Sequence, residues 1–143
     1  MAPEGQGGPM GRAPAIVGMD GLSVVIARCP PGDKPMLHAH MRTCETFMPL
    51  KGKFLIRWGD RGEHETVLEQ FDMIAVPPAV CRDFTNITDE EALLLVLVQG
   101  KNREDFNDIL FAEEDSQKAL KKYGREVLDN LKKVGQLFKG VNA

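Results

Sequence analysis

The chain has 143 residues, and its hydrophobic content of 43% suits one folded domain with its own core and is too high for a disordered chain. Lys and Arg are scattered along the chain and the net charge is -3, so we expect no nucleic-acid partner. The longest apolar run, residues 92–98, is far shorter than the roughly 20 residues that cross a bilayer, so we expect no membrane insertion either.

The N-terminal segment, residues 1–14, is rich in Gly and Pro, which hinder both helix formation and burial. It is predicted to be a flexible arm, and it contains no apolar stretch typical of an export signal. The three cysteines, Cys29, Cys44 and Cys81, have spacings that match no zinc pattern. We therefore expect a cytoplasmic protein with reduced thiols.

Residues 15–100 alternate short β-prone runs with turn residues and show no helical pattern between the runs. The predicted strands cover residues 22–29, 45–50, 54–58, 65–68, 71–76, 82–86 and 92–98. Many short strands in succession favour an antiparallel sandwich or barrel, and closing a barrel would remove exposed strand edges. The expected fold is mainly β, a single antiparallel β-barrel of the jelly-roll type with a C-terminal helical extension.

The extension, residues 101–143, changes to a helical period. Apolar residues recur there at three- and four-residue steps, namely Leu120, Tyr123, Val127, Leu131, Val134 and Phe138. This spacing predicts an amphipathic helix over residues 118–138, with its apolar face packed on the outside of the barrel or across a dimer interface.

The pattern with the most chemical content is His38-Ala-His40, followed by Glu45. In a strand, residues i and i+2 project to the same face, with Cα atoms about 6.5 Å apart. Two imidazoles so placed can converge on one metal ion at about 2.0–2.1 Å per bond, and a carboxylate five residues later can supply a third ligand. Two His and one carboxylate are the ligands of non-haem iron oxygenases, and they leave coordination positions open for substrate.

These residues, with Gly32 and Gly52, resemble the first conserved motif of the cupin family. That motif reads Gly, five residues, His-x-His, three or four residues, Glu, six residues, Gly, and every fixed position is met. The resemblance covers roughly residues 20–98. It implies a cupin β-barrel, a divalent metal ion (Fe, Mn, Ni or Zn) held by His38, His40 and Glu45, and a homodimer.

The second cupin motif is met only in part. Pro77 and Asn86 match it, whereas Phe71 and Ala79 stand where the motif has glycines. Arg82 replaces the histidine that usually completes the metal site.

Arg82 is the departure with the largest chemical consequence, because a guanidinium cannot donate a lone pair to a metal and a buried cation needs an anion beside it. We hypothesise that Arg82 is a catalytic residue that pairs with the carboxylate or enolate of a substrate. In one alternative, Arg82 forms a salt bridge with Glu45 and no metal binds. In another, a slip of one or two residues sends Arg82 outward and brings Cys81 near the cavity, where a thiolate would be a good metal ligand.

The remaining candidates have weaker signals. His64, in a polar turn, is expected to be a solvated loop residue. Five large side chains are candidates either for an apolar pocket lining or for ordinary core packing: Phe47, Phe54, Ile56, Trp58 and Phe84.

Two classes of function follow. Open coordination positions make an enzyme plausible, a dioxygenase with Fe(II) or an isomerase or lyase with Zn, Mn or Ni, acting on a small, carboxylate-bearing molecule. The alternative is a non-catalytic module that binds a small molecule through Arg82 and whose metal site is empty or degenerate. Cupins include enzymes, sensor domains and storage proteins, so family resemblance alone does not choose between the two.

Overall fold

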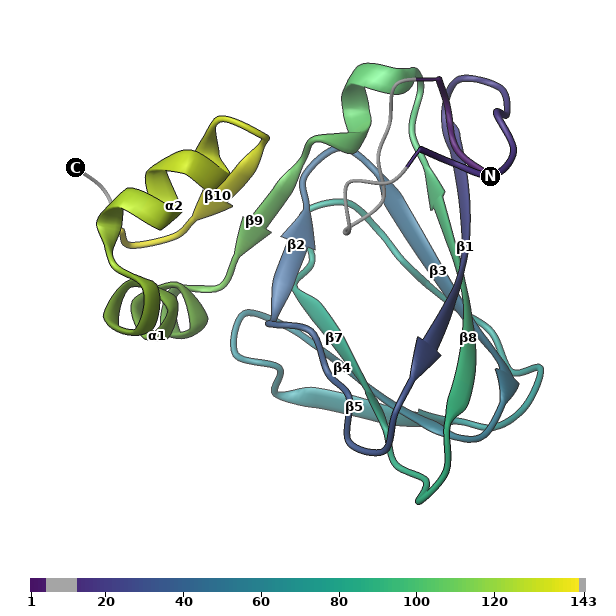
Figure 1. The fold of residues 1–143 in the computed structure, drawn as a ribbon. Helices are drawn as coiled ribbons and strands as arrows, with labels where there is room; N and C mark the ends of the chain where they lie inside the picture. Colours follow the sequence, from purple (N-terminus) through teal and green to yellow (C-terminus); the bar gives the residue numbers. More distant parts are fainter. Residues whose placement is uncertain (5–12, 142–143) are drawn as a thin grey trace.

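The predicted β-prone runs form two β-sheets that face one another in the computed structural model, which describes residues 1–4 and 13–141 (Figure 1). The strands are β1 (Leu22–Cys29), β2 (His38–His40), β3 (Cys44–Lys51), β4 (Phe54–Trp58), β5 (His64–Leu68), β6 (Ile74–Val76), β7 (Arg82–Asn86), β8 (Ala92–Gln99), β9 (Ile109–Phe111) and β10 (Gln136–Phe138). Every strand predicted from the sequence has a counterpart among them, although β6 is shorter than predicted.

The first sheet has the strand order β1-β8-β3-β6, and all its pairs are antiparallel. The apolar run at residues 92–98 forms most of β8, which pairs with β1 on one side and β3 on the other. This run therefore occupies the centre of the sheet, where backbone groups are paired on both sides and alternate side chains are buried.

The second sheet has the order β10-β9-β2-β7-β4-β5, and only the β10–β9 pair is parallel. Its third strand, β2, is three residues long and lies between β7 and β9. His38 is therefore in register with Arg82 on one side and with Phe111 on the other.

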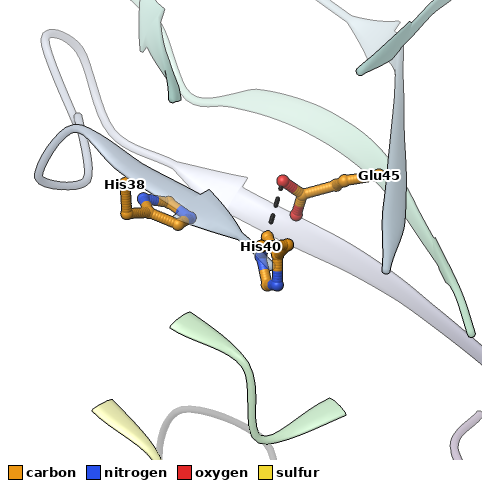
Figure 2. Close-up of side chains that lie close together, drawn as sticks. All are labelled: His38, His40 and Glu45. Atoms are coloured by element: carbon orange, nitrogen blue, oxygen red, sulfur yellow. Dashed lines mark ion pairs between the residues drawn. The ribbon is translucent and has the colours of Figure 1, made fainter. Parts of the chain in front are cut away.

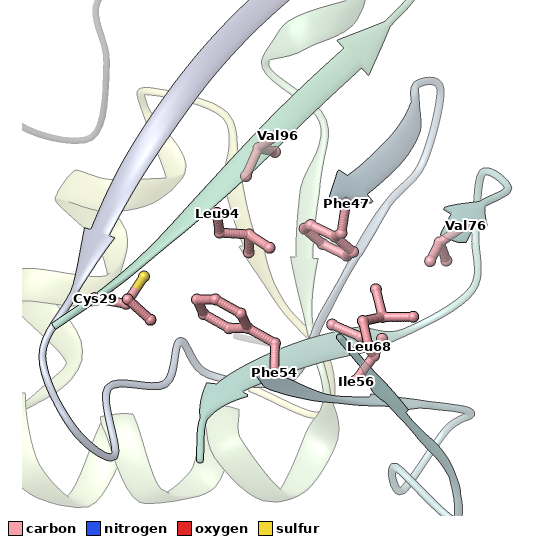
Figure 3. Close-up of a cluster of buried hydrophobic side chains, with 9 residues drawn as sticks. Cys29, Phe47, Phe54, Ile56, Leu68, Val76, Leu94 and Val96 are labelled. Atoms are coloured by element: carbon pink, nitrogen blue, oxygen red, sulfur yellow. The ribbon is translucent and has the colours of Figure 1, made fainter. Parts of the chain in front are cut away.

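The main core fills the space between the two sheets (Figure 3). Its buried members are Cys29, Phe47, Phe54, Ile56, Leu68, Val76, Ala92, Leu94 and Val96. Among the five large side chains singled out above, Phe47, Phe54 and Ile56 are buried here and Phe84 packs against them. Trp58 lies outside this cluster, half-buried at the end of β4 and beside the ring of His64.

A single closed barrel is not confirmed. The strands form two hydrogen-bonded sheets, and no ladder joins the outer strands of one sheet to those of the other in the described residues. The outer strands β5 and β6 are only five and three residues long, which limits the pairing they can offer to a neighbouring sheet edge.

The continuous helix predicted over residues 118–138 is wrong. The extension contains a 3-10 helix, η1 (Arg103–Phe106), then β9, helices α1 (Glu113–Tyr123) and α2 (Arg125–Lys132), and β10. Gly124, at φ 80° and ψ 166°, interrupts the helix and shifts its phase. Tyr123, Val127 and Val134 are exposed in consequence, although their spacing placed them on the buried face.

The extension has a small core of its own, formed by Phe111, Ala119, Leu128, Phe138 and Val141. Met36, which precedes β2, packs against this second core. The extension is thus attached to the second sheet both by the β9–β2 ladder and by side-chain packing.

The first residues of the chain contact β1. Ala2 pairs with Val17, and the backbone of Met1 exchanges two hydrogen bonds with Val24, at 2.7 and 2.8 Å. Residues 5–12, most of the predicted arm, lie outside the described residues. No helix in residues 1–4 and 13–141 is both long enough and apolar enough to cross a membrane.

Candidate metal centre

Strands β2 and β3 bring His38, His40 and Glu45 together (Figure 2). The two histidines project to the same face of β2, with ring centroids 5.3 Å apart, and the short 41–43 connection returns the chain so that Glu45 points toward His40. One ligand atom from each residue can be chosen so that all three lie within 4.8 Å of one another.

The hydrogen bonds of the two imidazoles fix which nitrogen is free. His38 Nδ1 lies 2.7 Å from the carbonyl oxygen of Met36, and His40 Nδ1 lies 2.7 Å from Oδ1 of Asp108. A carbonyl and an ionised carboxylate can only accept, so each Nδ1 carries the hydrogen and donates it. In a ring that carries one hydrogen, Nε2 then keeps the lone pair that a metal ligand needs.

Burial supports a neutral His38. It lowers the pKa of His38 to about 4, and the neighbouring His40 and Arg82 act in the same direction, whereas the hydrogen bond to Met36 opposes the shift. His38 is therefore uncharged at neutral pH, and no proton competes with a cation for its Nε2.

Glu45 provides the third acceptor. Only 7% exposed, it holds Oε2 3.7 Å from His40 Nε2. Burial raises the pKa of Glu45, while His40 and Arg82 oppose the shift. Oε2 is buried and has no hydrogen-bond partner among the residues that the structure describes.

The three groups fit a divalent metal ion. One ligand atom from each residue lies within 4.8 Å of the others, and no donor among the described residues is aligned with Glu45 Oε2, an arrangement that a cation would stabilise. Two ligands of one ion at about 2.1 Å each are at most about 4.2 Å apart, so the 3.7 Å contact between His40 Nε2 and Glu45 Oε2 fits one shared ion. The nitrogen and oxygen donor set suits Fe, Mn, Ni and Zn alike.

Arg82, the first residue of β7, extends beside this cluster. It is fully buried, and its Nε lies 3.3 Å from Glu45 Oε2 without being aligned as a hydrogen bond. Burial lowers the pKa of Arg82, and Glu45 and Asp108 oppose that shift. Nη2 donates a long hydrogen bond to the carbonyl of Val76, whereas Nε and Nη1 have no hydrogen-bond partner within residues 1–4 and 13–141.

Arg82 thus faces Glu45, and Cys81 is outside the cluster. The described residues contain one group of three or more His, Cys, Asp or Glu side chains with metal-binding spacing, His38, His40 and Glu45. His64 is exposed, as expected, but it is the first residue of strand β5 and not a loop residue, and it is not part of this group.

Asp108 is a site residue that the sequence reasoning missed. The residue is 3% exposed. Besides the hydrogen bond from His40, its carboxylate accepts hydrogen bonds from the backbone N–H groups of Arg42 and Thr43 and from the Thr43 hydroxyl, each at 2.9 Å. Burial alone would raise the pKa of Asp108, but the hydrogen bonds, led by that from His40, outweigh it and lower the pKa to about 2. Asp108 is therefore a carboxylate throughout the neutral range.

No spacing pattern in a single sequence connects Asp108 to His40, which is 68 residues earlier. Asp108 also lies in the segment predicted to be helical. The β9–β2 ladder is what brings it to the site, with Ile109 in register with His40.

The two residues that replace glycines of the second cupin motif have positive φ angles. Phe71 and Ala79, which stand at glycine positions of that motif, have φ values of 72° and 65° and are the non-glycine residues of the described chain with positive φ. The Ala79 N–H donates to the carbonyl of His40 at 2.8 Å, so this turn contacts β2 directly. The alignment made from the sequence therefore identifies positions that require a left-handed backbone.

The model of the cupin domain family matches residues 25–98, which is more than half of the chain and includes both histidines, Glu45 and Arg82. Together with the two facing sheets, this match shows that the chain belongs to the cupin family. No curated protein matches the chain.

Solved structures with similar folds include a sugar phosphate isomerase of the cupin superfamily from Silicibacter pomeroyi, with a TM-score of 0.52 and 27% identity over 57% of this chain and 52% of that chain. A double-stranded β-helix protein from Klebsiella pneumoniae has a TM-score of 0.57 and 19% identity over 68% of this chain and 80% of that one. The cupin domain of Cnp3 from Schizosaccharomyces pombe has a TM-score of 0.52 and 15% identity over 57% of each chain. The match therefore spans little more than half of the Silicibacter and Schizosaccharomyces structures.

Proposed function

We propose that this protein is a metal-dependent enzyme that binds a divalent ion through His38, His40 and Glu45 and acts on a small anionic organic molecule. The observation that carries the proposal is the grouping of His38, His40 and Glu45, each with one ligand atom within 4.8 Å of the others, together with a buried Oε2 of Glu45 that has no hydrogen-bond partner in the described residues. Packing alone does not account for two histidines and a carboxylate directed at the same point.

The reaction class is supported by similarity. The Silicibacter pomeroyi protein, at 27% identity, is described as a sugar phosphate isomerase. Between the two classes that the ligand set allows, dioxygenase and isomerase or lyase, this favours the second. A bound ion would supply Lewis-acid polarisation of a substrate oxygen.

Arg82 supplies the anion-binding part of the proposal. Its buried Nε and Nη1 have no hydrogen-bond partner in the part of the chain that the structure describes, and a carboxylate or phosphate oxygen would satisfy both. When Glu45 ligates a metal, its charge is shared with the ion, and Arg82 then needs a second anion. A substrate carboxylate or phosphate meets that need, and it is held beside the metal ligands.

The first test is metal content. We expect about one equivalent of a divalent metal in the purified protein by mass spectrometry, and we expect His38→Ala and Glu45→Gln each to lose it because each removes one of three ligands. His64→Ala, which removes the exposed histidine of β5, is the matched control and should retain the metal. Stoichiometric metal in either ligand variant would contradict the assignment.

The second test addresses Arg82. We expect Arg82→Met to retain the metal but to bind pyruvate and inorganic phosphate, the simplest carboxylate and phosphate probes, more than about tenfold more weakly by calorimetry. Arg82→Lys should fall between, because it keeps the charge without the planar pair of donors. Arg61→Met, a change at an exposed arginine, is the control. Loss of metal in Arg82→Met would instead assign Arg82 a structural role at Glu45.

A non-catalytic binding module is the second candidate, favoured by one observation. The Arg82–Glu45 ion pair at 3.3 Å already offsets the Glu45 charge that a metal would use. In this case the wild-type protein would take up no metal, even on anaerobic addition of each ion, and would still bind the anionic probes through Arg82.

A further inference from the structure

Whenever the His40 ring carries a single hydrogen, two carboxylates compete for it. Asp108 Oδ1 is 2.7 Å from Nδ1, and Glu45 Oε2 is 3.7 Å from Nε2. If the hydrogen were on Nε2, it would point toward Glu45 and occupy the lone pair that a metal requires. The tautomer of His40 therefore decides whether a metal can bind.

We propose that Asp108 is a positioning residue that holds His40 in the Nδ1–H tautomer and so keeps its Nε2 available to a cation. The expected effect of Asp108 on cation binding rests on the proposed function, whereas its effect on the His40 tautomer does not. Carboxylates that orient a histidine ligand raise the basicity of the ligating nitrogen and fix the ring orientation.

The surroundings of Asp108 suit this role, because its second oxygen is fully engaged elsewhere. Oδ2 accepts hydrogen bonds from the backbone N–H groups of Arg42 and Thr43 and from the Thr43 hydroxyl. Oδ1 is thereby left for His40, and the carboxylate is held in one orientation. These donors belong to the connection between β2 and β3, so Asp108 also anchors the loop that separates His40 from Glu45.

The residue comes from outside the part of the chain that the cupin family model matches, residues 25–98. Arg42 ties the two parts together, since its Nη2 donates to the carbonyls of Glu104 and Asn107 at 2.9 Å. The backbone N–H of Met41 donates to the carbonyl of Asp108 itself at 2.9 Å. The extension thus completes the arrangement of a site whose ligands all lie in the cupin domain.

The test reads the tautomer directly, from long-range ¹H–¹⁵N spectra of the histidine rings in metal-free protein at neutral pH. In the wild type we expect the Nδ1–H form at His40. In Asp108→Asn, whose single oxygen cannot serve both His40 and the loop, and in Asp108→Ala, we expect the Nε2–H form to become populated. His38, whose Nδ1 donates to Met36, is an internal control and should not change.

The matched control is Thr43→Val, which removes one buried hydrogen bond to the same carboxylate but leaves the His40 contact in place. With Co²⁺ as the probe, titrated by its absorption spectrum, we expect the Asp108 variants to bind about 10- to 100-fold more weakly than wild type. Thr43→Val should bind within about threefold of wild type and keep the Nδ1–H tautomer. A purely structural role for Asp108 would move stability in all three variants and would leave the tautomer unchanged.

The outcomes separate the two proposals. A wild type that binds no Co²⁺ but shows the Nδ1–H form, lost in the Asp108 variants, would overturn the metal function and support the role of Asp108. An Nε2–H form of His40 in the wild type would overturn the inference even if no Asp108 variant folds. Retention of both the Nδ1–H form and the wild-type Co²⁺ affinity in Asp108→Ala would do the same.

Discussion

Phe71 and Ala79 have a left-handed backbone conformation that is unfavourable for residues with a Cβ atom. A left-handed conformation costs a residue with a Cβ about 1–2 kcal/mol, and both positions are held by backbone hydrogen bonds, from Phe71 to Pro49 and from Ala79 to His40. The surrounding turns therefore impose a conformation that the side chains do not favour.

Replacing Ala79 by Gly should stabilise the protein. The free energy gained by relieving backbone strain exceeds the entropic cost of ordering a glycine on folding. We expect the free energy of unfolding, measured by urea denaturation, to rise by about 0.5–1 kcal/mol. Ala75→Gly, in an exposed position of β6 with ordinary strand geometry, is the control, and its free energy of unfolding should fall by a similar amount. Equal destabilisation by both changes would show that Ala79 carries no strain.

At the scale of single residues, the grouping of His38, His40 and Glu45 could be predicted because strand geometry links i and i+2 and because the cupin spacing includes Glu45. Arg82 was placed correctly beside Glu45 by the second motif, despite having the wrong side chain for it. Asp108 could not be found in this way, because its position depends on a ladder between β9 and β2 that leaves no local pattern.

Among the elements, the turn between β3 and β4 is the most tightly constrained. Gly52 has a φ of 84°, and a Cβ there would lie 2.7 Å from the Cβ of buried Ala92. Gly32, the other glycine of the first motif, has a φ of 74° but faces open space. The two glycines thus share a conformation and differ in their surroundings.

Substitution of these glycines by alanine separates backbone strain from steric overlap. We expect Gly32→Ala to cost about 1 kcal/mol and Gly52→Ala about 2–4 kcal/mol, since the second adds an overlap with the core strand β8. Chemical denaturation followed by the fluorescence of Trp58 measures both. Equal losses would mean that the β3–β4 turn shifts away from Ala92 at little cost.

The elements also mark where periodicity stops being informative. Strands were predicted well, because each β-prone run between residues 22 and 98 is bounded by turn residues. The extension was misread, because the apolar spacing continues through Gly124 although the helix does not. Strand β10 was likewise hidden in a helical pattern, since it is only three residues long and is formed by pairing with β9.

On the scale of the whole molecule, the two cores belong to one hydrogen-bonded system. The main core lies between the sheets and the second lies in the extension, but β9 is part of the same sheet as β2 and β4. Unfolding of either core would therefore leave a strand of the other without its neighbour in the second sheet, because β9 pairs with β2.

Unfolding should accordingly be a single transition. Ellipticity at 222 nm reports on α1 and α2, and Trp58, the only tryptophan, reports on β4. We expect the two signals to change with the same urea midpoint, and to separate only when a variant such as Asp108→Ala loosens the connection between β2 and β9. Distinct midpoints in the wild type would show that the extension unfolds independently.

The contact of Met1 with Val24 has a consequence for colloidal behaviour. An outer strand of eight residues with exposed Val25 and Ile26 is a template on which a foreign strand could add, the first step toward fibrils. Near the N-terminal end of that strand, both outward backbone groups of Val24 are already bonded to Met1. An incoming strand must first displace the chain's own N-terminal residues, so β1 carries a built-in guard against fibrillar growth.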